Sequence, residues 1–185
     1  LSIGIVCGGF SNEREISLIN EAQSYTEEVR RIVKTDYGFE KLYSQGLSIK
    51  TPLNIKYQTQ AIKSLRKGIE QYDRRHGWRG PITNKLKSKN WKNKIENFKL
   101  DPTLDWKLAE IEDLNASEIK FRIIDESTNN LKGILKANEI RWAIKGKKNI
   151  LDKFEVGDII FVKKENGLWK LKQYPKVNGG IIALD

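Results

Sequence analysis

The chain has 185 residues, 38% hydrophobic and 31% charged, and no stretch approaches the roughly 18 apolar residues of a membrane span, which is typical of a globular protein. One cysteine, Cys7, excludes an internal disulfide and a cysteine-based zinc site, and one histidine, His76, excludes mechanisms that need a histidine pair. The net charge of +10 resides in residues 41–100, whose 15 basic and 3 acidic side chains favour anionic surfaces, whereas residues 1–40 and 101–185 carry −3 and +1.

The first expected element is a short strand over residues 3–7, followed by a turn at Gly8-Gly9 and the start of a helix. The stretch over 5–18 reads IVCGGFSNEREISL. This layout resembles the first strand, glycine turn and first helix of D-alanine–D-alanine ligases. The resemblance implies that Glu13 binds substrate, since a carboxylate there can pair with the amino group of a D-alanine. Nothing after Leu18 continues the ligase pattern, so the residues by themselves indicate a turn after a buried strand.

Helices are expected in the next block. Ser24 and Glu27 have the spacing of a capping box, and apolar residues then recur at helical spacing as far as Gly38. The alternation in GLSIKTPLN predicts a strand over 47–53. A helix should follow and end at Gly77. Its apolar stripe consists of Ile62, Leu65, Ile69 and Tyr72. The basic residues 85–99 indicate either a short helix or a loosely held linker.

From Trp106 onward the apolar residues alternate. The strand candidates are WKLAEIE (106–112), EIKFRII (118–124), LKGILKA (131–137), DIIFVKK (158–164) and GLWKLKQY (167–174). Asn166-Gly167 predicts a tight hairpin, because both residues tolerate positive φ. Five short strands with little helix between them predict a small OB-like β-barrel, of the oligonucleotide/oligosaccharide-binding kind. The expected fold class is an α+β fragment, a helical and extended linker segment plus this five-stranded barrel.

A second resemblance covers roughly residues 21–185. It rests on SYTEEVRRIV, YGFEKLYSQGLSIKTPLN and QYDRRHGWRGPI, and later on FEVGDIIFV and GLWKLKQYPKVNGGIIALD. These stretches resemble the region of class A penicillin-binding proteins between the glycosyltransferase and transpeptidase domains. The resemblance implies a non-catalytic fragment of a bifunctional peptidoglycan synthase of bacterial cell-wall synthesis, at the periplasmic face of the inner membrane. The implied partners are the parent's glycosyltransferase and transpeptidase domains, and a regulatory protein or glycan on the barrel.

The catalytic residues of that family do not carry over to this chain. Ser64–Lys67 matches Ser-x-x-Lys in the middle of a predicted helix, and Ser117–Lys120 matches it in a strand region. The chemistry needs the serine at a helix start and a Lys-Thr-Gly strand beside it, and the sequence contains no Lys-Thr-Gly. We therefore expect no catalytic residue, no metal ligand and no cofactor here, with both catalytic centres of the parent outside this chain.

Together the two resemblances predict a composite chain. The parts are a ligase-like strand, turn and helix start over 1–20, a linker region over 21–103, the barrel over 104–175 and the start of a transpeptidase domain over 176–185. The alternative is a nucleic-acid-binding OB-type module, for which Trp142, Phe161 and Trp169 are the candidate stacking residues. The near-neutral barrel argues against it, so no specific nucleic acid is expected. A D-alanine–D-alanine ligase fragment is the further alternative.

Overall fold

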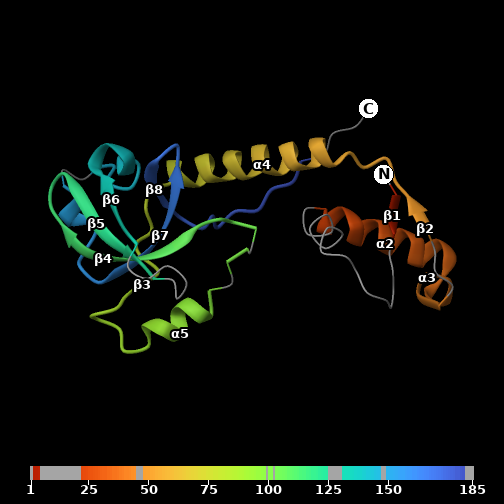
Figure 1. Cartoon of the computed structure of the whole chain (residues 1–185), viewed down its shortest axis with the longest axis horizontal. Helices are drawn as coiled ribbons and strands as arrows, with labels where there is room; N and C mark the ends of the chain where they lie inside the picture. Colours follow the sequence, from red (N-terminus) through yellow and green to blue (C-terminus); the bar gives the residue numbers. More distant parts are fainter. Residues whose placement is uncertain are drawn as a thin grey trace. The chain divides into compact units, whose positions relative to one another are not determined.

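A computed structural model describes residues 2–4, 22–44, 48–98, 100–101, 103–124, 131–146 and 149–181 of the chain (Figure 1). The chain divides into two compact units, one comprising Leu1–Arg66 with Gly180–Asp185 and the other Lys67–Gly179. Helices occur in both units and an antiparallel sheet dominates the second, which confirms the α+β class. In the part of the chain that is described, no helix has the length and apolar composition that a bilayer crossing requires.

In its described residues the first unit has two short strands, two helices and the beginning of a third helix, α4. Strand β1 (Ser2–Gly4) pairs antiparallel with β2 (Ser48–Lys50). The strand predicted over 47–53 is therefore confirmed in its first half, whereas residues 51–53 form no strand. Helices α2 (Gln23–Tyr37) and α3 (Phe39–Ser44) lie between β1 and β2 in the sequence. Glu13 lies outside the described residues, so its role stays a prediction.

The capping box predicted at Ser24 is wrong. Helix α2 begins at Gln23, and Ala22 precedes it without any side-chain cap. Glu27 does not reach back to the helix start, because both of its carboxylate oxygens accept hydrogen bonds from the Arg30 guanidinium, at 2.8 and 2.5 Å. The predicted end is confirmed at Gly38, whose φ of 84° lies in the left-handed region that favours glycine.

Helix α4 (Ile55–Arg75) is longer than the predicted apolar stripe and continues from the first unit into the second. The Asn54 side chain caps its start by accepting a hydrogen bond from the Lys56 amide at 3.0 Å. The helix ends directly before His76, and Gly77 follows with a φ of 84°. Both the existence of this helix and its predicted end are therefore confirmed.

The second unit is built on a six-stranded antiparallel sheet. Its strands are β3 (Thr83–Asn84), β4 (Lys107–Leu114), β5 (Glu118–Ile123), β6 (Lys132–Lys136), β7 (Asp158–Glu165) and β8 (Leu168–Lys172). Strands β4 to β8 are the five predicted strands, and β3 is an addition that the sequence did not predict. Pairing runs in the order β3-β7-β4-β5-β6, and β8 also pairs with β7. The predicted hairpin joins β7 to β8, with Asn166 and Gly167 both at positive φ.

The closed barrel that we predicted is not confirmed. Among the described residues, β6 and β8 form no backbone ladder, so the sheet is open between them. A side-chain contact joins the two strands instead, because the indole of Trp169 on β8 lies against Gly133 on β6. The short 3-10 helix η1 (Ala137–Ile140) follows β6, and a second one, η2 (Ile150–Asp152), precedes β7.

The core lies on one face of this sheet. It comprises Ala109, Ile111, Ile119, Phe121, Ile123, Leu135, Ile140, Ala143, Ile150, Phe154, Ile160, Val162 and Leu171. The members from β4, β5 and β7 sit at alternate positions, as a period of two requires. Alternating apolar residues thus direct one face of each strand inward.

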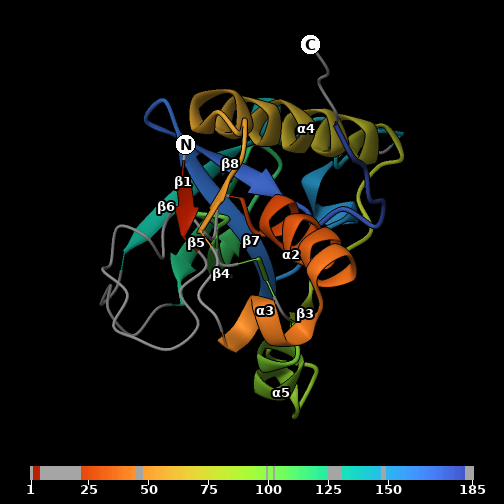
Figure 2. The same ribbon diagram turned by 90° about the vertical axis from the view of Figure 1, so that its right-hand side faces the viewer.

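Strand β7 is buried on both faces, which explains its uninterrupted run of apolar residues. Ile160 faces the core, while Phe161 faces away from it and packs against Phe98 and Trp106, with ring centroids 5.1 and 5.8 Å apart. Phe98 follows the short helix α5 (Trp91–Glu96), which lies beside β3 (Figures 1 and 2). The basic stretch 85–99 therefore contains the short helix that the sequence allowed.

Candidate functional site

The most connected polar cluster of the second unit joins the end of α4 to the segment that follows β8. The Asp73 carboxylate, 4% exposed, accepts hydrogen bonds from Arg79 Nη1 and from Gln173 Nε2, both at 2.7 Å. Arg79 also donates from Nη2 to the Tyr174 carbonyl at 2.7 Å, and its amide donates to the Gln173 side-chain oxygen at 2.9 Å. We call Asp73, Arg79 and Gln173 the Asp73 clasp.

The local sequence explains how the clasp closes. After α4 the chain reverses through two tight turns, in which the His76 amide donates to the Asp73 carbonyl and the Gly77 amide donates to the Arg74 carbonyl, each at 3.0 Å. The positive φ of Gly77 makes this reversal accessible without strain. The reversal brings Arg79 back over Asp73, six residues earlier in the chain.

A second cluster reinforces the same junction. Lys172 is 5% exposed, and its Nζ lies 2.8 Å from both Glu70 Oε2 on α4 and Glu165 Oε1 at the end of β7. Arg74 donates to the Leu171 carbonyl at 3.3 Å, and its guanidinium lies 5.2 Å from the centre of the Trp142 ring. The last turns of α4 are thus bound to β8 by charge-assisted contacts (Figure 2).

Burial would raise the pKa of the Asp73 carboxyl, but the hydrogen bonds from Arg79 and Gln173 outweigh it and hold the pKa below the usual range. A carboxyl with a lowered pKa in the folded state stabilises the fold above its unfolded pKa of about 3.9. That stabilisation is lost as the pH falls through the folded pKa. The pKa shift of Asp158 has the opposite sign, because burial raises the pKa of its carboxyl. Protonation of Asp158 in acid therefore favours the folded state.

We therefore expect Asp73→Asn to flatten the acid side of the stability profile. Urea unfolding of the wild type and the variant at several pH values between 7 and 3 measures this difference. At pH 7 the variant should be the less stable protein. The gap should begin to narrow near pH 4, where the carboxyl of the unfolded wild-type chain starts to protonate, and should narrow further as the pH falls through the lowered pKa of the folded state. A gap that stays constant over this range would contradict the assignment of the lowered pKa to Asp73.

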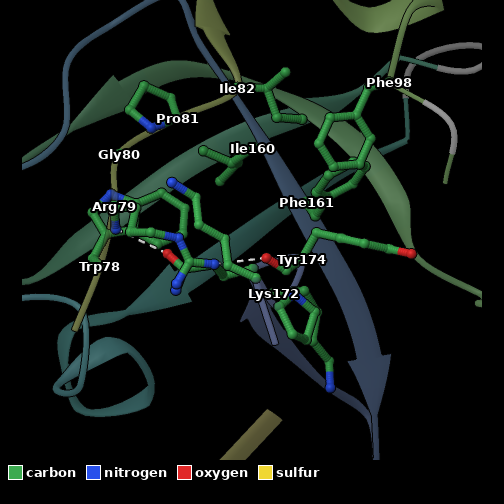
Figure 3. Close-up of a pocket in the computed structure, with 13 residues that line it drawn as sticks. Trp78, Arg79, Gly80, Pro81, Ile82, Phe98, Ile160, Phe161, Lys172 and Tyr174 are labelled. Atoms are coloured by element: carbon green, nitrogen blue, oxygen red, sulfur yellow. Dashed lines mark hydrogen bonds between the residues drawn. The ribbon is translucent and has the colours of Figure 1, made fainter. Parts of the chain in front are cut away.

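A pocket of about 290 Å³ lies beside the clasp. Its walls are the segments 78–82 and 172–176, and Phe98 and Phe161 line the side away from Arg79 (Figure 3). The clasp hydrogen bonds run between these two walls, as the dashed lines in Figure 3 show. The pocket is therefore the space that remains where the clasp holds two chain segments over β7.

The two serines of the Ser-x-x-Lys matches lie in different settings. Ser64 is exposed in the middle of α4, and Lys67 one turn later is also exposed. Ser117 precedes β5 and donates from Oγ to the Asn115 side chain at 2.7 Å, while Lys120 pairs with Asp113 at 3.1 Å. Neither serine stands at a helix start, where the acyl-transfer chemistry needs it.

The three candidate stacking residues do not share a strand face. Phe161 is buried on β7, whereas Trp142 lies in the turn after η1 and meets Trp78 edge-on, with ring centroids 5.7 Å apart. Trp169 on β8 meets Phe121 edge-on at 5.4 Å. Each ring is thus engaged in packing within the second unit. The described residues also contain no group of three or more His, Cys, Asp or Glu side chains that could hold a metal ion.

Comparison with known proteins identifies relatives of this chain. The family profile of the penicillin-binding protein OB-like domain matches residues 78–177. Penicillin-binding protein 1A of Rickettsia typhi is 32% identical over 166 residues, which cover 89% of this chain and 20% of that protein. The Rickettsia felis protein of the same name is 32% identical over 176 residues, covering 95% and 21%. Penicillin-binding protein 1A of Escherichia coli is 29% identical over 174 residues, covering 86% and 20%. The chain thus spans about a fifth of the length of these relatives.

Proposed function

Since the chain belongs to the family of penicillin-binding protein OB-like domains, we propose that it is a non-catalytic, inter-domain part of a bifunctional peptidoglycan synthase. In this proposal the glycosyltransferase and transpeptidase domains of the parent precede and follow the chain, at the periplasmic face of the inner membrane. The proposed division into 1–20, 21–103, 104–175 and 176–185 follows the two resemblances in the sequence.

The Asp73 clasp is the observation that carries the proposal. It binds the segment by which the chain enters the second unit to the segment by which it leaves, since Asp73 and Gln173 are 100 residues apart in sequence and 2.7 Å apart in space. A domain carried within a longer polypeptide tends to have its two ends close together, so that it interrupts the surrounding chain little. The clasp supplies this arrangement.

Further partners belong to the same proposal. A regulatory protein or glycan on the sheet unit is supported by the OB-like architecture, because domains of this architecture bind many ligands through an outer strand face and the adjoining loops. The basic block 41–100 favours anionic surfaces through its net charge of +12. No observation specifically favours nucleic acid or ligase chemistry, and the substrate role of Glu13 remains a proposal that rests on the ligase resemblance.

Fluorescent penicillin tests the proposal. We expect no covalent label on the isolated chain, because neither Ser64 nor Ser117 has the helix-start setting or the Lys-Thr-Gly strand that acylation requires. The reading frame that encodes this chain should continue into a Ser-x-x-Lys segment, and the longer polypeptide should be labelled.

Two results would overturn it. The first is a labelled band from the isolated chain that disappears on Ser64→Ala or Ser117→Ala. The second is a longer reading frame without a downstream Ser-x-x-Lys. A polypeptide labelled before but not after replacement of the downstream serine serves as the positive control.

A further inference from the structure

The chain passes between its two units twice. Helix α4 crosses from the first unit into the second between Arg66 and Lys67, and the segment after β8 crosses back between Gly179 and Gly180. Glycine occurs at both places, since Gly68 follows the first crossing directly after Lys67. Any change in the orientation of one unit against the other therefore has to bend the chain at these two crossings.

Packing does not account for the glycine inside α4. Gly68 is exposed, its φ lies outside the left-handed region, and a methyl group on its Cα would meet no atom within 4 Å. Alanine would fit at this position and would favour the helix, because glycine has the larger conformational entropy to lose. Among the described helices, α4 alone contains a glycine. The helix is thus easiest to bend or open beside the boundary between the units.

The contacts that fix the end of α4 to the second unit begin just after Gly68. Glu70 accepts a hydrogen bond from Lys172 Nζ at 2.8 Å, and the Asp73 carboxylate accepts one from Gln173 Nε2 at 2.7 Å. These bonds hold the last turns of α4 to β8 and to the segment that follows it. A bend at Gly68 leaves all of them intact, so the end of the helix moves together with the sheet.

The Asp73 clasp fixes the departing segment as well. The Lys176 amide donates to Asp73 Oδ1 at 3.4 Å, and Arg79 donates to the Tyr174 carbonyl at 2.7 Å. Beyond these contacts residues 177–181 are exposed, and a methyl group on Gly180 would meet no atom within 4 Å. On each of the two connections, a glycine therefore separates the clasp from the first unit.

We propose that Gly68 and Gly179–Gly180 form a double hinge, about which the second unit turns as a rigid body with the clasp closed. Hinges are a few residues that absorb large changes of φ and ψ, and glycine does so without steric cost. Because the clasp joins the two connections, a bend in one has to be accompanied by a bend in the other. This inference goes beyond the proposed inter-domain role and does not depend on which domains flank the chain.

Distances between spin labels, measured by pulsed electron paramagnetic resonance on the full chain, test the double hinge. Asp36→Cys with Asn138→Cys places one label on each unit, and Lys94→Cys with Asn138→Cys places both on the second unit. All three positions are exposed, and Cys7→Ser removes the native thiol. We expect the distance distribution of the first pair to be at least about twofold wider than that of the second pair.

Alanine at the hinge should narrow the distribution between the units. Gly68→Ala with Gly180→Ala should reduce its width by about a third, because alanine has fewer accessible backbone conformations. The matched control Ser64→Ala also improves helix propensity on an exposed face of α4 but keeps Gly68, so the width should not change. Circular dichroism verifies folding of each labelled variant, and Glu40→Cys replaces Asp36→Cys if that variant does not fold.

Three results would overturn the proposal. They are a distribution between the units as narrow as that within the second unit, an unchanged width in the variant with both alanines, and equal narrowing by Ser64→Ala. Penicillin labelling of the longer polypeptide does not depend on these glycines, so failure here leaves the inter-domain role intact.

Discussion

Asp73→Ala is expected to lower the free energy of unfolding by about 3 kcal/mol, which is at the lower end for breaking a buried ion pair. The carboxylate is 4% exposed, and its removal leaves Arg79 and Gln173 without their shared acceptor. The lower end applies because the Arg79 side chain is 28% exposed and regains some contact with water. Urea unfolding followed by tryptophan fluorescence measures the change.

A double-mutant cycle with Arg79→Ala separates the pair from its surroundings. Since each single change removes the same contact, the double variant should lose clearly less than the sum of the two single losses. Arg75→Ala is the matched control, because Arg75 is an exposed arginine two residues from Asp73 and outside the clasp, and it should change stability by less than about 0.5 kcal/mol. Strict additivity of Asp73→Ala and Arg79→Ala would show that the clasp is not a unit.

Gly133→Ala is expected to destabilise the second unit by about 2 kcal/mol, as overpacking of a filled core does. A methyl group at this position would lie 2.4 Å from Phe121 Cζ and 2.7 Å from Trp169 Nε1, closer than atoms can pack. Both rings are held in an edge-on pair inside the unit, so neither can move away freely. Thermal and urea unfolding both report the loss.

Gly68→Ala provides a control of opposite sign. Gly68 lies inside α4 with open space around its Cα, so a methyl group there meets nothing and improves helix propensity. The variant should be more stable by roughly 0.5 to 1 kcal/mol.

In a Trp169→Ala background, Gly133→Ala should lower the free energy of unfolding by less than it does in the wild type. An unchanged cost in that background would refute the contact between β6 and β8.

The local sequence was enough to predict the five longer strands, because apolar residues alternate within each of them. The Asn166-Gly167 pair also marked the turn between the last two strands. The local sequence was not enough for β3, which has two residues and exists through its pairing with Ile159 and Asp158 on β7. It also predicted a closed barrel, which is not confirmed. Strands β6 and β8 meet through the packing of Trp169 against Gly133, and no local pattern reports on two residues that are 36 positions apart. The capping-box pattern at Ser24 and Glu27 failed, because the Glu27 carboxylate accepts hydrogen bonds from Arg30 instead of from the helix start.

The clasp could not be predicted from sequence for a related reason. The run QYDRRHGWRGPI indicated a helix end and carried a family resemblance, and neither assigned a partner to Asp73. Asp73 becomes part of the clasp through its hydrogen bond with Gln173, which follows β8. No periodicity in the sequence links these two positions. An acidic residue within a basic helix end was the one available hint, since a lone carboxylate among arginines often bonds to one of them.

The distance in sequence between Asp73 and Gln173 has a consequence for biosynthesis. Translation proceeds at about 5 to 20 residues per second, so roughly 5 to 20 s pass between the appearance of the aspartate and that of its glutamine partner. During this interval α4 can form and Asp73 can bond to Arg79, but the segment that supplies the Gln173 side chain and the Lys176 amide to the carboxylate has not been made. The clasp can therefore close only after almost the whole second unit has been synthesised, and this unit completes its native contacts with its last-made segment.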